Sequence, residues 1–263
     1  MAEAEPLPPF TIGILLYPNC DPLDIAGPND AFEFWDASVI GRSSHVVSFA
    51  RTKKPMGGIG ALTISAGYTY EDCPPLDLLF VPGGGTDGVV KSLGDDRLLE
   101  AIRQKAKEAR YVVSVCTGGL LMAAAGLLDG REATTHWAVV DCMKLFRKVK
   151  VVNGCPRYVR DGNTFTGGGI SSSIDLSLFL IETITREQCG EKDPDKADAI
   201  AKQAAQQVQL SIQYNPQPPY PGGDPCSVDY AVYEPTAQNM KNYHDPVCAA
   251  VAKRVKRSSA GGR

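Results

Sequence analysis

Residues 111–137, YVVSVCTGGLLMAAAGLLDGREATTHW, contain the pattern that decides the fold. Tyr111–Val115 is a short run rich in β-branched residues, which is typical of a buried strand. The turn sequence CTGG follows at residues 116–119, and residues 120–128 are rich in the helix formers Leu, Met and Ala. A strand, a tight turn and a helix, with a thiol at the turn, predict a nucleophile elbow.

Two interpretations of the thiol at this turn are open. In the first, Cys116 lies at the N-terminus of the helix, where the helix dipole favours thiolate over thiol. In the second, Cys116 is a small buried residue that fills apolar space, as most cysteines of intracellular proteins do. The position of Cys116 between a strand and a Gly-rich turn favours the first interpretation.

Apolar strand patterns and helix patterns alternate from Thr11 to Thr185. Repeated strand–helix units predict a parallel sheet with helices on both faces, in which sites lie beyond the carboxyl ends of the strands. Four connections follow predicted strands and should converge there: an irregular Pro18–Pro28 loop with Asp24, the Gly83–Gly85 loop, Cys116-Thr117, and Gly167–Gly169. Further helices are expected at residues 29–35, 95–110, 141–146, 171–185, 195–212 and 238–257, and a hairpin around Asp161-Gly162.

The converging residues predict nucleophilic catalysis by Cys116. Asp24, held beside a thiol in an apolar pocket, could stay protonated and donate a hydrogen bond to sulfur. The N–H groups of Thr117 and of Gly84 or Gly85 could form an oxyanion cradle, and the Thr117 hydroxyl could relay a proton. The alternative for the glycine loop is an ordinary turn between a strand and a helix.

The histidines narrow the reaction class. Cysteine hydrolases usually pair the thiol with a histidine, and His136 is the only one of three that could serve. It follows the whole elbow helix, so we expect it at the wrong end of the sheet, in a structural hydrogen bond. This disfavours peptidase and amidotransferase activity, and favours thiolate addition to a small electrophilic carbon with Asp24 handling protons.

Composition excludes several other classes of protein. The chain has 263 residues, 43% of them hydrophobic, and a formal net charge of −3. These values fit one large α/β domain, or one domain with an extension, and give no indication of a nucleic-acid partner. No apolar stretch is long enough to span a membrane, and the acidic, Pro-rich N-terminus does not resemble a secretory signal. Eight scattered cysteines without a CxxC pair argue against a zinc site and a dense disulfide scaffold, although an even count leaves room for disulfides. We therefore expect a reducing, cytoplasmic location.

Four segments of the chain together resemble the ThiJ/PfpI superfamily. They are ILLYPNCDPLDIAGP at residues 14–28, FVPGGG at 80–85, the elbow VCTGGLLMAAAGLLDGREATTHW at 115–137, and VRDGNTFTGGGISSSIDLSL at 159–178. The resemblance covers residues 10–215 and implies a flavodoxin-like fold of the class I glutamine amidotransferase type. Within the superfamily, the isonitrile hydratases are the most similar branch.

The resemblance implies a reaction and a role for each site residue. Cys116 would attack the terminal carbon of an isonitrile to give a thioimidate, Asp24 would act as general acid or base and position water, and Thr117 would assist. Water would then release an N-substituted formamide. The pocket would be shaped by Gly84, Gly85 and Gly168. No metal and no organic cofactor are implied, and family members are commonly homodimers.

Other members of the superfamily provide the alternatives. Its glyoxalase and deglycase branches use Glu as the acid and often a His after the Cys, where this chain has Asp24 and Thr117. A glyoxalase-like 2-oxoaldehyde hydratase and a cysteine-based sensor of oxidative stress nevertheless remain open. Regulators of the AraC type add a helix-turn-helix domain, for which residues 216–263 are too short and too Pro-rich. We expect this segment and its helix to pack on, or extend, the domain at 10–215.

Overall fold

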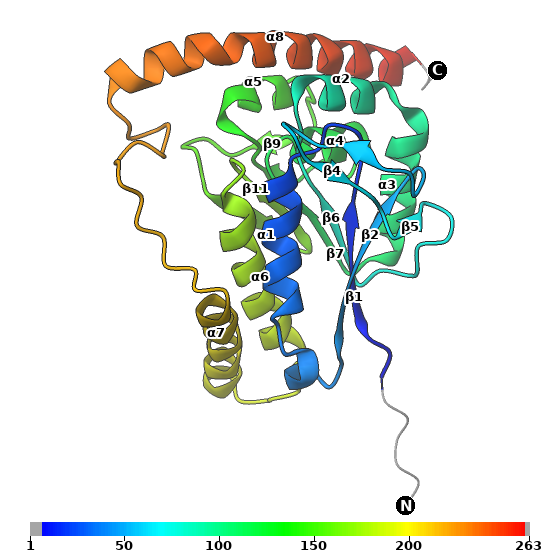
Figure 1. Ribbon diagram of the computed structural model, residues 1–263, viewed down its shortest axis with the longest axis vertical. Coiled ribbons are helices and arrows are strands. Elements are labelled where there is room, and N and C mark those ends of the chain that lie inside the picture. Colours follow the sequence, from blue (N-terminus) through cyan, green and yellow to red (C-terminus); the bar gives the residue numbers. More distant parts are fainter. Residues whose placement is uncertain (1–6, 261–263) are drawn as a thin grey trace, which may run out of the picture.

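The computed structural model describes residues 7–260 and has a seven-stranded sheet at its centre (Figure 1). The strand order is β10-β11-β7-β6-β1-β2-β5, and every neighbouring pair is parallel except β10 with β11. The strands are β1 (Phe10–Leu15), β2 (Ser44–Ala50), β5 (Tyr68–Thr69), β6 (Leu78–Val81), β7 (Tyr111–Ser114), β10 (Tyr158–Asp161) and β11 (Thr164–Gly167). The prediction of a parallel, flavodoxin-like α/β sheet is confirmed.

Helices cover both sides of this sheet (Figure 1). They are α1 (Pro22–Glu33), α2 (Thr86–Gly94), α3 (Asp96–Glu108), α4 (Gly118–Ala124), α5 (Val140–Met143), α6 (Ser172–Gln188), α7 (Pro194–Ser211) and α8 (Tyr230–Ala260). Short 3₁₀ helices η1 (Ala37–Ile40) and η2 (Trp137–Val139), and two-stranded pairs β3 (Met56–Gly57) with β4 (Thr63–Ile64) and β8 (Glu132–Ala133) with β9 (Lys150–Val151), complete the elements. Helix α6 packs between α1 and α7, and α3 lies on the other side of the sheet (Figure 1).

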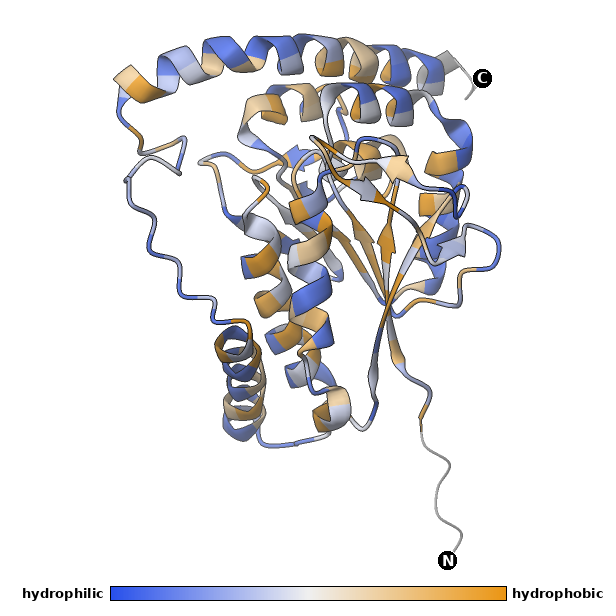
Figure 2. Cartoon of the chain, viewed as in Figure 1, coloured by the Kyte–Doolittle hydropathy of each residue, from blue (hydrophilic) through white to orange (hydrophobic). Residues whose placement is uncertain are grey.

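The three central strands β1, β6 and β7 are buried along their whole length. Figure 2 shows them as the most hydrophobic part of the fold, as expected for parallel strands covered on both faces. Their register places Ile14 beside Phe80, and Phe80 beside Val113. The three strands therefore end at the same level, and the loops that follow them meet.

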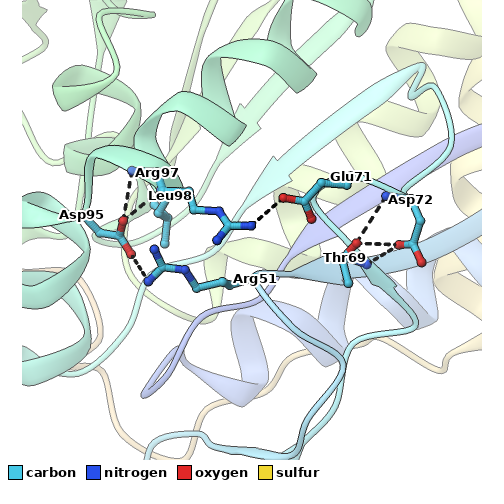
Figure 3. A network of polar contacts seen from close by, with 7 residues as sticks. All are labelled: Arg51, Thr69, Glu71, Asp72, Asp95, Arg97 and Leu98. Carbon is cyan, nitrogen blue, oxygen red and sulfur yellow. Dashed lines mark hydrogen bonds and ion pairs between the residues drawn. The ribbon is translucent and has the colours of Figure 1, made fainter.

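A polar network fixes the loop after edge strand β5 to the start of α3 (Figure 3). Asp95 caps α3 by accepting hydrogen bonds from the backbone N–H groups of Arg97 and Leu98. Arg51 pairs with Asp95 at 3.3 Å, and the Arg97 guanidinium pairs with Glu71 at 2.6 Å. Such exposed ion pairs contribute less than about 1 kcal/mol each, so the helix cap is the main element of order here.

The first helix differs from the sequence prediction. The expected Pro18–Pro28 loop contains the start of α1, which runs from Pro22 to Glu33. Asp21 caps this helix, because its side chain accepts a hydrogen bond from the Leu23 N–H at 2.9 Å. Pro22 occupies the first turn, where a missing N–H has no cost. Asp24 therefore lies in the first turn of a helix, and Pro28 is tolerated inside it.

Three other helices differ in length or existence. The sequence did not predict α2 at all, because Gly88 and Gly94 weaken its helical pattern. Helix α4 runs from Gly118 to Ala124, so it begins two residues before the run of helix formers at 120–128 and ends close to the expected end near Gly126. Helix α8 starts at Tyr230, eight residues before the expected start, and continues through Pro235 and Pro246. The predicted hairpin is formed by β10 and β11, and α6 and α7 are close to their expected bounds.

The C-terminal segment crosses the molecule from α7 to α8, which lies over α2 and α5 (Figure 1). Two disulfides tie it to the core, Cys142–Cys248 and Cys155–Cys226, whereas Cys20, Cys73, Cys116 and Cys189 are free thiols. The sequence predicts a reducing compartment, in which two disulfides are not expected.

No helix within residues 7–260 is long and apolar enough to cross a membrane. The predicted division of the chain into a domain at 10–215 and a segment at 216–263 stays a prediction. The sequence also predicts a loose tail at residues 1–9, most of which lies outside the described residues.

Candidate active site

The elbow after β7 holds Cys116 in a strained backbone conformation. Its φ angle of 54° lies in the left-handed region, which residues other than glycine rarely adopt. Two contacts hold it there. The Cys116 N–H donates to the Gly168 carbonyl at 2.8 Å, and the Thr135 hydroxyl donates to the Cys116 carbonyl at 2.8 Å. The loop after β11 and the segment after β8 therefore fix the direction of the thiol.

Gly83 lies between the two side chains that the sequence paired. Its N–H donates a hydrogen bond to Oδ2 of Asp24 at 2.7 Å. A Cβ atom on Gly83 would lie only 2.7 Å from Cβ of Cys116. Asp24 is 0% exposed and Cys116 is 5% exposed, so both residues are closed to bulk water, and Gly83 lies against each of them. The predicted convergence of the Asp24, Gly83–Gly85, Cys116 and Gly167–Gly169 segments is confirmed.

The Thr117 hydroxyl is held against the glycine loop. It accepts a hydrogen bond from the Gly84 N–H at 3.0 Å and is 3.5 Å from the Gly84 carbonyl. The Gly85 N–H donates to the Asn19 carbonyl at 2.8 Å. The amides of Gly84 and Gly85 are therefore engaged within the chain, which differs from the expected oxyanion cradle. The reason is that the loop closes on Asn19 and Thr117 instead of opening toward a ligand.

Burial controls the charges of the site. It raises the pKa of the Cys116 thiol well above its ordinary value, and the carboxylate of Asp24 raises it further. The backbone N–H and hydroxyl of Thr117 oppose this shift. The burial of the sulfur therefore acts against the lowered pKa that the sequence predicts for Cys116 at the start of α4.

Asp24 has the properties expected of an acid kept neutral. Burial raises its pKa well above the ordinary range, the charge of Asp21 adds to the shift, and the Gly83 N–H opposes it. Its second oxygen, Oδ1, is buried and has no hydrogen-bond partner among the described residues. A buried carboxyl with one unpaired oxygen is suited to hold a proton and to donate it.

His136 is a structural residue. Its Nδ1 accepts a hydrogen bond from the Ala138 N–H at 3.2 Å and so caps η2, and burial lowers its pKa to about 4. The ring is therefore neutral at physiological pH. The prediction that His136 lies far from the elbow is wrong, however. The neighbouring Thr135 donates a hydrogen bond to the Cys116 carbonyl. The chain returns because α4 ends at Ala124 and Gly126 and Gly130 turn it with positive φ angles.

Two tyrosines near the site were missed by the sequence reasoning. Tyr17, directly beyond β1, donates its hydroxyl to the Pro82 carbonyl at 3.1 Å. Tyr243, in α8, donates to the Gly84 carbonyl at 2.8 Å. Burial raises the pKa of both phenols, so both stay protonated donors. The position of Tyr17 after a central strand was a usable signal, whereas the pattern around Tyr243 gives none.

Two side-chain groups could in principle hold a metal ion, Cys142 with His244 and Cys248, and Cys155 with Asp224 and Cys226. In each group the two sulfur atoms form a disulfide and are not available as thiolate ligands. Neither group includes the residues around Cys116. The absence of a metal and of an organic cofactor from the reaction stays a prediction.

Known proteins resemble this chain over most of its length. An isonitrile hydratase from Pseudomonas putida is 39% identical over 223 residues, which cover 85% of this chain and 86% of that protein. The crystal structure of a THiJ/PfpI family protein from Pseudomonas syringae has a TM-score of 0.77 and 26% identity, and covers 92% of this chain and 90% of that one. The transcriptional regulator GbdR of Pseudomonas aeruginosa is 29% identical over 122 residues, 46% of this chain and 32% of the regulator. Residues 11–183 match the DJ-1/PfpI family, and the chain belongs to that family.

Proposed function

We propose that this protein is a cofactor-free hydratase that adds water to an isonitrile, with Cys116 as its nucleophile. The observation that carries the proposal is the buried, unpaired Oδ1 of Asp24 beside the strained Cys116. The similarity to an isonitrile hydratase over 85% of the chain supports the choice of substrate. An isonitrile is small and uncharged, so it can enter a site that penalises charge.

In the first step, sulfur forms a bond to the terminal carbon of R–N≡C. Because burial disfavours a second negative charge, the pair of Cys116 and Asp24 shares one proton when it reacts, with the sulfur as the thiolate and Asp24 as the acid. Asp24 delivers this proton to the carbon as the sulfur bonds to it, and Asp24 is left as a carboxylate. The product is a thioimidate, R–N=CH–S–Cys116, which carries no net charge.

In the second step, water adds to the thioimidate carbon. The carboxylate of Asp24 takes a proton from that water as the oxygen–carbon bond forms. Asp24 passes the proton it took from water to the nitrogen, the carbon–sulfur bond breaks, and the proton of the added hydroxyl returns to the pair of Cys116 and Asp24. The net reaction is R–NC plus water to R–NH–CHO, with Cys116 and Asp24 restored. The Thr117 hydroxyl, fixed by the Gly84 N–H, holds the sulfur in place throughout.

The test is conversion of an alkyl isonitrile, such as cyclohexyl isonitrile, to its formamide, followed by proton NMR. Cys116→Ala should abolish turnover, and Asp24→Asn should lower kcat by about 10²–10⁴-fold because the proton donor is lost. Cys189→Ala removes a free thiol at the end of α6 and serves as the matched control. Turnover by Cys116→Ala, or no formamide from protein with reduced Cys116, would contradict the proposal.

A second measurement tests the intermediate. Mass spectrometry of wild-type protein quenched during turnover of the isonitrile should show an adduct of one substrate molecule on Cys116, and Cys116→Ala should show none. Consumption of methylglyoxal without formamide formation would instead support the glyoxalase-like alternative. A homodimer and a cytoplasmic location, both expected from the sequence, stay predictions.

A further inference from the structure

Helix α8 reaches the site around Cys116. The Tyr243 hydroxyl donates to the Gly84 carbonyl at 2.8 Å, and the Gly84 N–H donates to the Thr117 hydroxyl at 3.0 Å. The charges of Cys116 and Asp24 both act on the Tyr243 phenol. Only one residue of the glycine loop therefore separates α8 from the residue that follows the nucleophile. This helix lies outside residues 11–183, which match the family.

Apolar side chains attach α8 to the rest of the molecule along its second half. Val247 and Val251 are fully buried, and Tyr243, Cys248, Ala250 and Val255 are partly buried against the core, whereas Tyr230 and Val232 near the start of α8 are 68% and 52% exposed. Arg254 and Arg257 also pair with Asp96 of α3. Figure 2 shows hydrophilic positions along much of the helix. Pro246 interrupts the helical hydrogen bonds three residues after Tyr243, so the attachment of α8 over the site depends on the contacts of Tyr243 and of the segment after Pro246.

One covalent bond strengthens this attachment next to the site. The Cys142–Cys248 disulfide joins α5 to α8, with Cα atoms 4.8 Å apart, and Cys248 lies five residues after Tyr243. Cys248 is half-buried and Cys142 is fully buried, so Cys248 is the more accessible residue of the two. Nε2 of His244 lies 3.4 Å from the Cys248 sulfur. The more accessible residue of the bond thus has an imidazole beside its sulfur.

We infer that the Cys142–Cys248 disulfide is a redox switch that holds α8 closed over Cys116, and that its reduction by a dithiol opens the site. With the bond broken, noncovalent contacts are left to hold this part of the helix: the Tyr243 hydrogen bond, the buried Val247 and Val251, and the partly buried Ala250. The inference that the switch regulates substrate entry rests on the proposed function. The inference that the switch controls access to the Cys116 thiol does not depend on the proposed function.

The reduction balances without another reactant. A thiolate of the dithiol attacks the Cys248 sulfur, the bond to Cys142 breaks, and the Cys142 sulfur leaves with the electron pair and takes up a proton. The second thiol of the reductant then attacks the reductant's sulfur in the mixed disulfide, and the Cys248 sulfur leaves with the electron pair and takes up the proton of that thiol. Two cysteine thiols form, and the dithiol is oxidised to a disulfide.

The experiment measures the alkylation rate of Cys116 by iodoacetamide, using a double variant that cannot form the bond, Cys142→Ser with Cys248→Ser. Tryptic peptide 111–131 contains Cys116 as its only cysteine, so mass spectrometry follows that thiol alone. The matched control is Cys155→Ser with Cys226→Ser, which removes the other disulfide but leaves the bond beside Tyr243.

An internal reference separates opening of the site from general loosening. Cys73 is a free thiol that is 5% exposed, like Cys116, and it lies near the edge of the sheet in tryptic peptide 54–91. The readout is the Cys116 rate divided by the Cys73 rate. EDTA is present throughout, because His244 and the two sulfur atoms lie within 4.8 Å of one another and a metal ion could replace the bond in reduced wild-type protein.

We expect this ratio to rise at least tenfold in the Cys142/Cys248 double variant and in wild-type protein treated with dithiothreitol. It should stay at the wild-type value in the Cys155/Cys226 double variant. An unchanged ratio in the first variant, or an equal rise in both variants, overturns the switch. Alkylation requires no hydration of an isonitrile, so failure of the switch and failure of the proposed function are distinguishable.

Discussion

Gly83 is the residue on which the geometry of the site depends most directly. Its N–H binds Asp24, and a Cβ atom at this position would lie 2.7 Å from both Cβ of Cys116 and the backbone nitrogen of Thr117. A backbone atom cannot move aside as a flexible side chain can. The absence of a side chain at this position is therefore what allows acid and thiol to meet.

Gly83→Ala should consequently lower kcat at least 100-fold and destabilise the fold by about 1–3 kcal/mol, the usual range for overpacking a tight core position. The measurements are formamide production and urea unfolding. Gly94→Ala is the control, since a Cβ there meets no atom within 4 Å. Equal effects of the two substitutions would show that the contact at Gly83 is not critical.

The charge of Asp24 should make stability depend on pH. Its pKa is raised in the folded protein, so the folded state binds this proton more tightly than the unfolded state does. The resulting stabilisation is complete below the ordinary pKa of about 4 and is lost as pH rises through the folded pKa. Between these values, the free energy of unfolding therefore falls with rising pH.

Asp24→Asn should remove this decline. Urea unfolding at pH 4.5 and pH 8 should show that the variant gains stability relative to the wild type as pH rises. Asp30→Asn, at an exposed position of the same helix, is the matched control. A constant difference between wild type and Asp24→Asn at both pH values would contradict a raised pKa for this carboxyl.

At the scale of elements, the sequence was most informative where periodicity was strong. The buried runs that became β1, β6 and β7 identify the sheet, and the CTGG turn identifies the elbow. The segment Pro18–Pro28 was wrongly predicted as a loop because Pro22, Gly27 and Pro28 are typical of loops. In the structure, Pro22 starts α1. Of the two-residue strands, β4 and β9 lie within the apolar runs 62–64 and 149–152, which the sequence predicts as strands. The strands β3, β5 and β8 are set by tertiary pairing, which no local pattern encodes.

The cap of α1 should affect both stability and catalysis. Asp21→Ala removes the acceptor of the Leu23 N–H and should cost about 1 kcal/mol of stability. It also removes a charge that raises the pKa of Asp24. Because Asp24 must hold a proton when the reaction begins, the alkaline limb of the pH profile of kcat/KM should shift to lower pH. Asp36→Ala, which removes the cap of η1, should cost similar stability and leave that profile unchanged. An unshifted profile in Asp21→Ala would argue that Asp24 does not govern the alkaline limb.

At the scale of the whole molecule, the local patterns of the first 185 residues were sufficient to predict which loops meet. They could not predict what covers the site. Tyr243 reaches Gly84 through a helix whose position depends on two disulfides, and cysteine pairing over such separations leaves no trace in spacing. The predicted cradle of Gly84 and Gly85 failed for a related reason, because the partners of backbone amides are set by tertiary packing.

The disulfides also make a prediction about global stability. In the chain-entropy account, closing loops of 106 and 71 residues stabilises the fold by about 4–5 kcal/mol each, because the unfolded chain loses freedom. The Cys142→Ser/Cys248→Ser and Cys155→Ser/Cys226→Ser variants should therefore both show clearly lower free energies of unfolding in urea. If the first variant unfolds like the wild type by a probe of the sheet, then α8 separates before the core, and the entropic stabilisation is not part of the main transition. Both variants could lose stability while Cys116 is alkylated faster in the Cys142→Ser/Cys248→Ser variant alone. This result would show that the Cys142–Cys248 bond controls both stability and access to Cys116, whereas the Cys155–Cys226 bond contributes to stability.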